Sequence, residues 1–262
     1  MIKGVVKGKM TNAQRARYHQ QTERIRYTAQ KSMRANLRRI FKAQEAAILE
    51  LPDPSMDQVR NILIQSVPAL NRVFEATYVN VADAIYPLLD KDVKSYASYD
   101  VKAKKEDTAY EAAIREWIRN ECGIKITYIN ETTLNQVRAL FEASANQIEF
   151  REAIAPLFDN SITPFRSNAI ARTETACATN RASVTTMESL GFDGRKTWLA
   201  VGDMDTRDTH MHMDNVTVDF DQDFEWDRPD GIHVRMECPL DHKWAPPASE
   251  VVNCRCDVGF EY

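Results

Sequence analysis

Histidines and cysteines gather near the carboxyl end of this 262-residue chain. Four of the five histidines and three of the five cysteines lie in the last sixty residues: His210, His212, His233, His242, Cys238, Cys254 and Cys256. Imidazole and thiolate are preferred zinc ligands. The pattern therefore indicates a candidate zinc site, with Cys238, Cys254, Cys256 and His210 as its ligands. No other cofactor is indicated.

The cysteine pair near the end can be read in two ways. Cys254 and Cys256 are two residues apart, so in a strand their side chains share a face and can chelate zinc if two further ligands approach. In the other reading they are small buried hydrophobic residues. A disulfide between them is not expected, because residues so placed are too far apart for good geometry. With an odd number of cysteines and no secretory signal, reduced thiols or metal ligands are favoured.

A second set of residues offers acid/base chemistry. Carboxylates together with a histidine can activate water on a divalent ion, which is the chemistry of a metal-dependent nuclease or related hydrolase. The candidates are Glu174, Asp203, Asp205, Arg207, His210 and Asp214. The alternative is a buried polar network that fixes loops onto the helix carrying Arg172 and Glu174, in which arginines pair with carboxylates. We favour the network, and hence a protein that is not an enzyme, because the spacing matches no known catalytic motif.

Charge is distributed unevenly along the chain. Residues 1–50 carry a net charge of +9, residues 203–262 carry −10, and the whole chain carries −4. A basic amino-terminal helix predicts contact with a polyanion such as DNA or with an acidic protein surface, although a solvated helix face is the alternative. The candidate contact residues are Arg15, Arg17, Arg24, Arg26, Lys31, Arg34, Arg38 and Arg39. His19, His212 and His233 are expected on the surface or in loops.

Helices are predicted to position most of these residues. Apolar residues at helical spacing predict a long helix from Ile25 to Leu51, ended by Pro52. Further helices follow up to Tyr96. The polar stretch 95–107 is the best linker candidate. Gly123 is expected to stop a helix, and 124–129 to form a short strand followed by a helix capped at Thr132 or Thr133. Thr163 and Pro164 are expected to start a helix that ends at Gly191.

After Gly191 the segments become short, and Asp, Pro and aromatic residues recur. The predicted fold class is therefore α+β: a mainly helical amino-terminal region followed by a small carboxyl-terminal α+β domain with short strands and long ordered loops. The predicted domains are 1–100, with the basic helix, and 101–262, with its core motifs in 164–262. No apolar run approaches the roughly 20 residues of a membrane span, so no membrane contact is expected.

Several short motifs occur together in a defined order. They are Ala171-Arg172-Thr173-Glu174-Thr175, Trp198, Asp203, Arg207, His210, Asp214 and Asn253-Cys254-Arg255-Cys256. In this order and spacing the chain, from Gly123 to Tyr262, resembles the phage minor head proteins of the Mu-F-like family. The resemblance implies that these residues hold the carboxyl-terminal domain together. Two positions depart from the family pattern: Asn215 stands where many relatives have Gly, and Val251-Val252 replaces His-Pro, which removes one candidate metal ligand.

The resemblance also implies a function. A member of this family is expected to be a virion structural protein, a minor capsid protein that acts at the portal inside the capsid in head morphogenesis, DNA packaging or DNA ejection. Its implied partners are the portal protein and the major capsid or scaffold proteins, with genomic double-stranded DNA as a further partner of the basic helix. The expected location is the virion interior near the portal, and the host cytoplasm during assembly.

Overall fold

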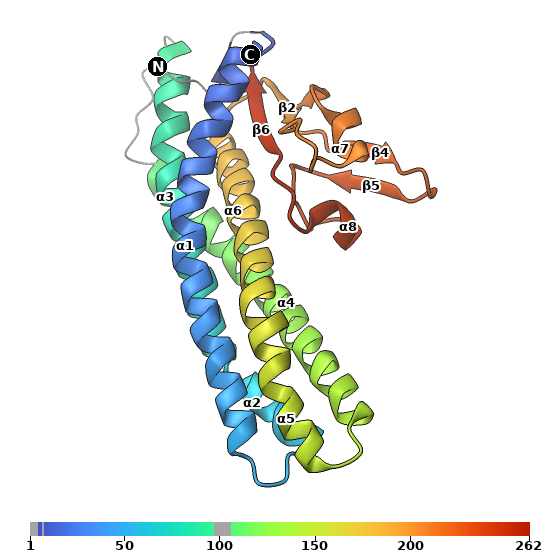
Figure 1. The fold of residues 1–262 in the computed structure, drawn as a ribbon. Coiled ribbons are helices and arrows are strands. Elements are labelled where there is room, and N and C mark those ends of the chain that lie inside the picture. Colours follow the sequence, from blue (N-terminus) through green and yellow to red (C-terminus); the bar gives the residue numbers. More distant parts are fainter. Residues whose placement is uncertain (1–4, 7, 97–105) are drawn as a thin grey trace. The chain divides into compact units, whose positions relative to one another are not determined.

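The fold is mostly helical, with a small amount of sheet near the carboxyl end. The computed structural model describes residues 5–6, 8–96 and 106–262. They form helices α1 (Asn12–Glu50), α2 (Met56–Gln65), α3 (Val67–Tyr96), α4 (Glu106–Ala143), α5 (Gln147–Leu157), η1 (Phe158–Arg166) and α6 (Ser167–Ser189), all seen in Figure 1. Short strands and two short helices follow α6, which confirms the predicted α+β class.

Two compact units share these elements. The first, here called the sheet-bearing unit, contains Met1–Ala29, Tyr78–Arg115 and Arg172–Tyr262. The second, the helical unit, contains Gln30–Thr77 and Glu116–Ala171. Both units are therefore assembled from segments that are distant in sequence. Most of the predicted linker, 97–105, lies outside the described residues. The predicted domain boundary at residue 100 lies there as well.

The helical unit is built around the apolar stripe of α1. Met33, Leu37 and Phe41 are fully buried, as their helical spacing predicts. Gln44 continues the stripe and is also buried; its side-chain amide nitrogen donates to Ser66 Oγ at 2.7 Å, which gives the buried NH₂ group a partner inside the core. The helix ends at Glu50, ahead of Pro52, as predicted.

The sheet-bearing unit contains a four-stranded sheet in the order β1-β6-β2-β3. Its strands are β1 (Val5–Val6), β2 (Arg195–Leu199), β3 (Thr217–Asp219) and β6 (Asp257–Glu261). β6 pairs parallel with β1 and antiparallel with β2, where Leu199 faces Asp257 and Arg195 faces Glu261. All five residues of β6 are buried. The last strand of the chain is therefore a central strand of the sheet, and helices must cover its polar side chains.

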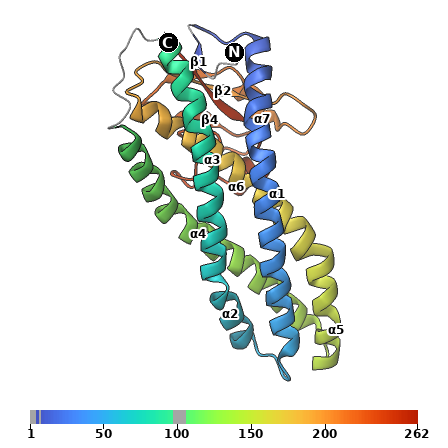
Figure 2. The ribbon, with the colours of Figure 1, turned by 90° about the vertical axis from the view of Figure 1, so that its left-hand side faces the viewer.

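Other short elements complete this unit. A second sheet is the hairpin of β4 (Phe224–Asp227) and β5 (His233–Met236). Helices α7 (Asp208–Met213) and α8 (Ala248–Val251) lie in the connecting loops. In both views the beginning of α1 and the later part of α6 run beside β6 (Figures 1 and 2). The predicted stop at Gly191 is confirmed: it has a φ of 65°, and Phe192 N–H donates to Met187 O across the helix end.

The predicted strand at 124–129 is wrong, because α4 is continuous through it. Ile126 and Ile129 are buried while Ile124 and Tyr128 are exposed, which is a helical spacing and not strand alternation. Gly123 does not stop the helix, and Thr132 and Thr133 do not cap one: their hydroxyls donate to carbonyls four residues earlier in the same helix. Burial against neighbouring helices outweighs the local β-branched composition.

The helix start predicted at Thr163 and Pro164 is also wrong. These residues lie inside the π-helix η1, which joins α5 directly to α6. Thr163 does not cap a helix end; its carbonyl accepts from Ser167 Oγ at 2.5 Å. Proline cannot donate a backbone hydrogen bond, and the wider π turn accommodates it without ending the helix.

No helix among the described residues combines the length and the apolar character needed to cross a lipid bilayer.

Candidate functional site

One histidine and two cysteines meet inside the sheet-bearing unit. His210 comes from α7, and Cys254 and Cys256 come from the segment just before β6; all three are buried. The Nδ1 atom of His210 lies 3.5 Å from the Sγ of Cys254 and 3.5 Å from that of Cys256. Their potential ligand atoms all lie within 4.8 Å of one another. This is the donor set that soft divalent metals prefer.

The other nitrogen of His210 faces a buried carboxylate. Glu250 Oε2 lies 3.1 Å from His210 Nε2, and only 3% of the Glu250 side chain is exposed. Thr209 Oγ1 donates to the same oxygen at 2.9 Å, and Arg228 pairs with Oε1 at 3.2 Å. Trp198 packs edge-on against the imidazole with a centroid distance of 5.3 Å. The orientation of the His210 ring is thus fixed from three sides.

The two thiols are not electrostatically equivalent. Burial disfavours a thiolate at Cys254, yet hydrogen bonds from Cys256 and His210 hold the pKa of Cys254 well below its ordinary value. The hydrogen bond to Cys254, together with burial, raises the pKa of Cys256 well above the ordinary value. The pair therefore carries one negative charge more readily than two in the absence of a cation.

Cys238, predicted as a further metal ligand, is not part of this group. It is buried near Arg181, Asp241 and Cys177, and burial raises its pKa well above the ordinary value. His242 is also outside the group. Among the described residues, His210, Cys254 and Cys256 are the predicted ligands that the structure brings together.

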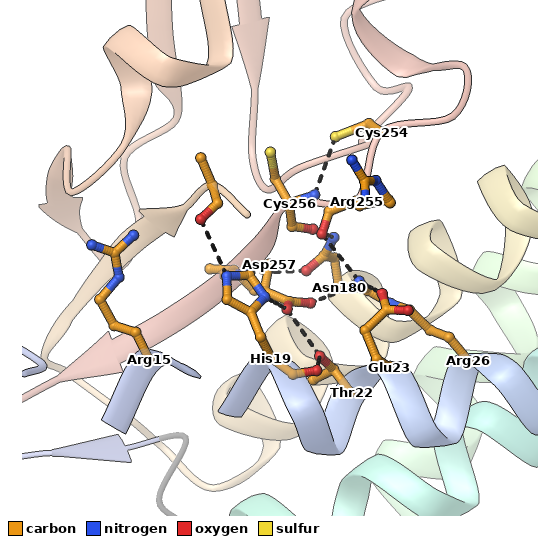
Figure 3. A network of polar contacts seen from close by, with 12 residues as sticks. Arg15, His19, Thr22, Glu23, Arg26, Asn180, Cys254, Arg255, Cys256 and Asp257 are labelled. Carbon is orange, nitrogen blue, oxygen red and sulfur yellow. Dashed lines mark hydrogen bonds and ion pairs between the residues drawn. The ribbon is translucent and has the colours of Figure 1, made fainter. Parts of the chain in front are cut away.

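A buried ion-pair network lies next to the cysteines, on β6 (Figure 3). Asp257 is fully buried and accepts from Arg26, His19 and Thr22, all on α1. Arg26 is 1% exposed, and it also donates to the carbonyl of Arg255 at 3.2 Å. The network fastens the start of α1 to the central strand of the sheet.

Electrostatics reinforce this arrangement. Burial alone would raise the pKa of Asp257, but Arg26 and His19 bring it below the ordinary value. Burial would lower the pKa of His19, but the Asp257 carboxylate raises it above 6.5. His19 was expected on the surface or in a loop; that prediction is wrong, because its imidazole lies against Asp257 with a side-chain exposure of 16%. His212 and His233 are exposed, as predicted.

Helix α6 holds the segment that carries the cysteines. Asn180 donates to the Cys256 carbonyl and accepts from the Val258 backbone, both at 3.0 Å. The Thr173 hydroxyl accepts from the backbone N–H of Asn253 at 2.9 Å. Asn253 has a φ of 61°, a conformation that asparagine tolerates better than most residues. Thr173 and Asn180 thus connect α6 to the backbone on both sides of Cys254 and Cys256.

The departure from the family pattern at Asn215 is accommodated. Asn215 has a φ of 66°, the region that favours glycine, so the turn is kept with asparagine in place. Asp214 caps this turn by accepting from the Ala200 backbone at 2.9 Å and from the Asn215 amide at 2.8 Å. Arg15 of α1 donates to both residues. Arg15 therefore helps to fix this loop.

The remaining motif residues lie in different places. Glu174 is buried and accepts from the hydroxyl of Tyr78, whereas Arg172 is exposed, so the prediction that Arg172 belongs to a buried network is wrong. Asp203 is partly exposed and pairs with Arg255 at 2.6 Å. Arg207 donates to the Val252 carbonyl.

The predicted acid/base residues do not all lie together. Asp205, Arg207 and His210 line one small pocket, while Glu174 and Asp214 pair with residues elsewhere.

The predicted basic contact residues divide into three groups. Arg26 is buried and paired with Asp257, so the prediction that it contacts a partner is wrong. Arg15 and Arg34 are half-buried, and Arg34 donates to Asn168 at 3.3 Å. The remaining residues are exposed on α1: Arg17, Arg24, Lys31, Arg38 and Arg39.

Sequence reasoning missed Asp257, Glu250 and Tyr78. A carboxylate directly after the cysteine motif, at the start of the final strand, is the signal that could have pointed to Asp257. Nothing local identifies Glu250 or Tyr78, since each becomes important only through a partner that is distant along the chain: 40 residues separate Glu250 from His210, and Tyr78 is 96 residues from Glu174.

The fold and the site define a mostly helical protein whose small sheet is tied to helices by buried polar contacts. Residues 135–259 match the family model described as Phage Mu protein F like protein. This match confirms the predicted resemblance to the Mu-F-like family and supports a phage head morphogenesis protein.

Two further comparisons bear on identity. The chain is 36% identical over 90 residues to a protein of Enterococcus faecalis (strain ATCC 700802 / V583) named NAD(+)–arginine ADP-ribosyltransferase EFV. That match covers 33% of this chain and 17% of the relative, so the chain spans a small part of the relative's length and the match establishes no enzymatic activity. No solved structure matches the chain.

Proposed function

We propose that this protein is a minor capsid protein that acts at the portal, inside the phage head, during head assembly, DNA packaging or DNA ejection. The observation that carries the proposal is the family match over residues 135–259, which contains the motif residues that organise the sheet-bearing unit. The proposed location is the virion, with the host cytoplasm during assembly, and the proposed protein partners are the portal and the major capsid or scaffold proteins.

The exposed basic residues of α1 are the proposed contact with genomic DNA. Arg17, Arg24, Lys31 and Arg38 follow one another at intervals of seven, which places them along one side of the helix. Cations in such a row neutralise phosphates without reading base sequence. Contact with double-stranded DNA fits this chemistry; an acidic surface on the portal would also bind the row.

One experiment separates these partners. Arg17, Arg24 and Lys31 are changed to Gln, and Arg60, Arg72 and Arg115, which are exposed on other helices, are changed to Gln as the matched control. For DNA contact, the wild type binds random double-stranded DNA with strong salt dependence, and the α1 variant lowers the slope of log K against log salt by about 2–3. Unchanged DNA binding with loss of portal co-purification would instead assign the row to the portal.

The head-assembly role has its own test. Purified virions are analysed by quantitative mass spectrometry, and particles from a phage lacking this gene are examined for assembled heads and packaged DNA. The proposal expects the chain in the virion and a defect in heads or in their DNA content. A chain absent from virions, with normal heads and normal infectivity in its absence, would overturn it.

A metal-dependent nuclease or related hydrolase is the second candidate. The observation in its favour is the pocket that brings Asp205 and Arg207 next to His210 and the two cysteines. It predicts cleavage of DNA or RNA that requires a divalent metal and disappears in a folded His210→Ala variant. Absence of cleavage with each of zinc, magnesium and manganese would reject this candidate.

A further inference from the structure

The spacing of three buried side chains matches that of zinc ligands. With Zn–S of about 2.3 Å and Zn–N of about 2.0–2.1 Å, a tetrahedral angle separates sulfur from nitrogen by about 3.5–3.6 Å. Both Sγ–Nδ1 separations at His210 are 3.5 Å. The geometry therefore admits a metal ion between the three side chains, at a separation that also suits N–H···S hydrogen bonds in its absence.

The surroundings of His210 also fit a metal ligand. A ligating histidine commonly donates its second ring N–H to a carboxylate, which fixes the tautomer and makes the ring a better ligand. Glu250 Oε2 lies at an ion-pair distance of 3.1 Å from His210 Nε2, although without the alignment of a hydrogen bond, and it is itself held by Thr209 and Arg228. Nδ1 is the nitrogen that faces both thiols, so it is the atom placed to bind the ion.

The cysteines are held in place by the backbone and by α6. Cys256 N–H donates to Cys254 Sγ at 3.4 Å, a contact that positions this sulfur. Asn180 fixes the Cys256 carbonyl, and Asn253, which precedes Cys254, is fixed by Thr173. The ligand geometry is therefore built by contacts that do not depend on the ion.

We propose that His210, Cys254 and Cys256 bind one zinc ion, and that the fourth coordination position faces the adjacent pocket. That pocket is open to solvent and is lined by the three ligands together with Asp205, Thr206 and Arg207. The fourth ligand is water, because the Asp205 side chain is 89% exposed and lies toward Arg255, 3.8 Å away. The ion joins α7 to the segment before β6 and balances the charge of two buried thiolates.

The test uses the full chain, purified under reducing conditions and titrated with zinc. Bound metal is measured by elemental mass spectrometry, and cobalt replaces zinc as a spectroscopic probe. The expected result is one equivalent per chain, with thiolate-to-cobalt charge-transfer bands and the visible bands of four-coordinate cobalt. Less than stoichiometric metal in a folded, reduced protein, or a cobalt spectrum without thiolate bands, overturns the proposal.

Variants assign the ligands. Cys254→Ser is expected to abolish stoichiometric binding, while Cys238→Ser, a buried cysteine outside the group, is expected to retain it. Retention of zinc in Cys254→Ser, or its loss in a folded Cys238→Ser, contradicts the three-ligand assignment. If Cys254→Ser fails to fold, Glu250→Gln serves as the second variant, because it keeps all three ligands. It is expected to weaken zinc binding about 10–100-fold, measured by competition with a chelator. An unchanged zinc affinity would overturn the proposed role of Glu250 and the site geometry with it.

Discussion

Arg26 of α1 and Asp257 of β6 form an ion pair in which neither side chain reaches solvent: their exposed fractions are 1% and 0%. Such a pair stabilises a fold mainly because breaking it leaves a buried charge without compensation. Here the pair joins the first long helix to the last strand of the chain, 231 residues away. His19 and Thr22 bind the same carboxylate, so one residue of β6 anchors almost two turns of α1.

Asp257→Asn is expected to lower the free energy of unfolding by about 3–5 kcal/mol, because it removes the negative charge and leaves Arg26 buried. Equilibrium urea unfolding measures the effect. The control is Asp203→Asn, which removes a partly exposed ion pair with Arg255 and should cost only about 0–1 kcal/mol. Equal losses in the two variants would contradict the anchoring role of Asp257.

Stability is expected to decrease as pH rises through neutrality. The pKa of His19 is raised above 6.5 by Asp257, so the charged imidazole stabilises the folded state fully below its unfolded pKa. That contribution is lost as pH rises through the folded pKa. His19→Gln should flatten this dependence in urea titrations at several pH values, whereas His212→Gln, at an exposed position, should not. If the free energy of unfolding of His19→Gln depends on pH as that of the wild type does, the His19–Asp257 pair contributes nothing to stability.

At low pH the titration of Asp257 governs how the stability of the fold depends on pH. The pKa of Asp257 is held below its ordinary value of 3.8, so its stabilising contribution is present above that value and is lost as pH falls through the folded pKa. The midpoint of acid unfolding should therefore lie at a lower pH for the wild type than for Asp257→Asn, with each transition normalised to the folded signal of the same protein. The circular dichroism signal at the helical band follows both transitions, and coincident acid midpoints would speak against the prediction.

Glu174 and Arg172, neighbours in one motif, should respond differently to mutation. Glu174→Ala leaves the buried Tyr78 hydroxyl without this acceptor and should cost about 1–3 kcal/mol. Arg172→Ala, at an exposed position, should stay within about 0.5 kcal/mol. A double-mutant cycle with Tyr78→Phe measures the coupling, and a coupling energy near zero would refute the assigned hydrogen bond.

Two glycines offer a matched test of backbone packing. A Cβ on Gly194 would lie 2.4 Å from the Glu261 carbonyl oxygen and 2.5 Å from Phe192 Cζ, so Gly194→Ala should destabilise by about 1–3 kcal/mol. Gly123 lies exposed within α4 with nothing near its Cβ position, so Gly123→Ala should stabilise by about 0.5–1 kcal/mol. Thermal unfolding compares the two, and a stabilising Gly194→Ala would show that the close approach to β6 is not real.

The sequence by itself determined the fold class, the long helix ended by Pro52, the helix stop at Gly191 and the family resemblance. These features depend on local physics or on ordered motifs: apolar spacing, the missing N–H of proline and the freedom of glycine at positive φ. The same local signals failed at 124–129 and at Thr163. There the chain lies inside long helices, and burial of one face outweighed β-branched composition and an apparent start signal.

For the candidate site, the sequence named His210, Cys254 and Cys256, because their types suit a soft metal, but it could not exclude Cys238. Only the tertiary structure decided which thiols meet His210 and that Glu250 lies beside it. Likewise, only the structure showed that Arg26 pairs with Asp257 instead of a partner and that His19 lies against Asp257 instead of at the surface. The reason is physical: a side chain's type gives its chemistry, whereas its pKa, burial and partners depend on groups that only folding brings within a few ångströms.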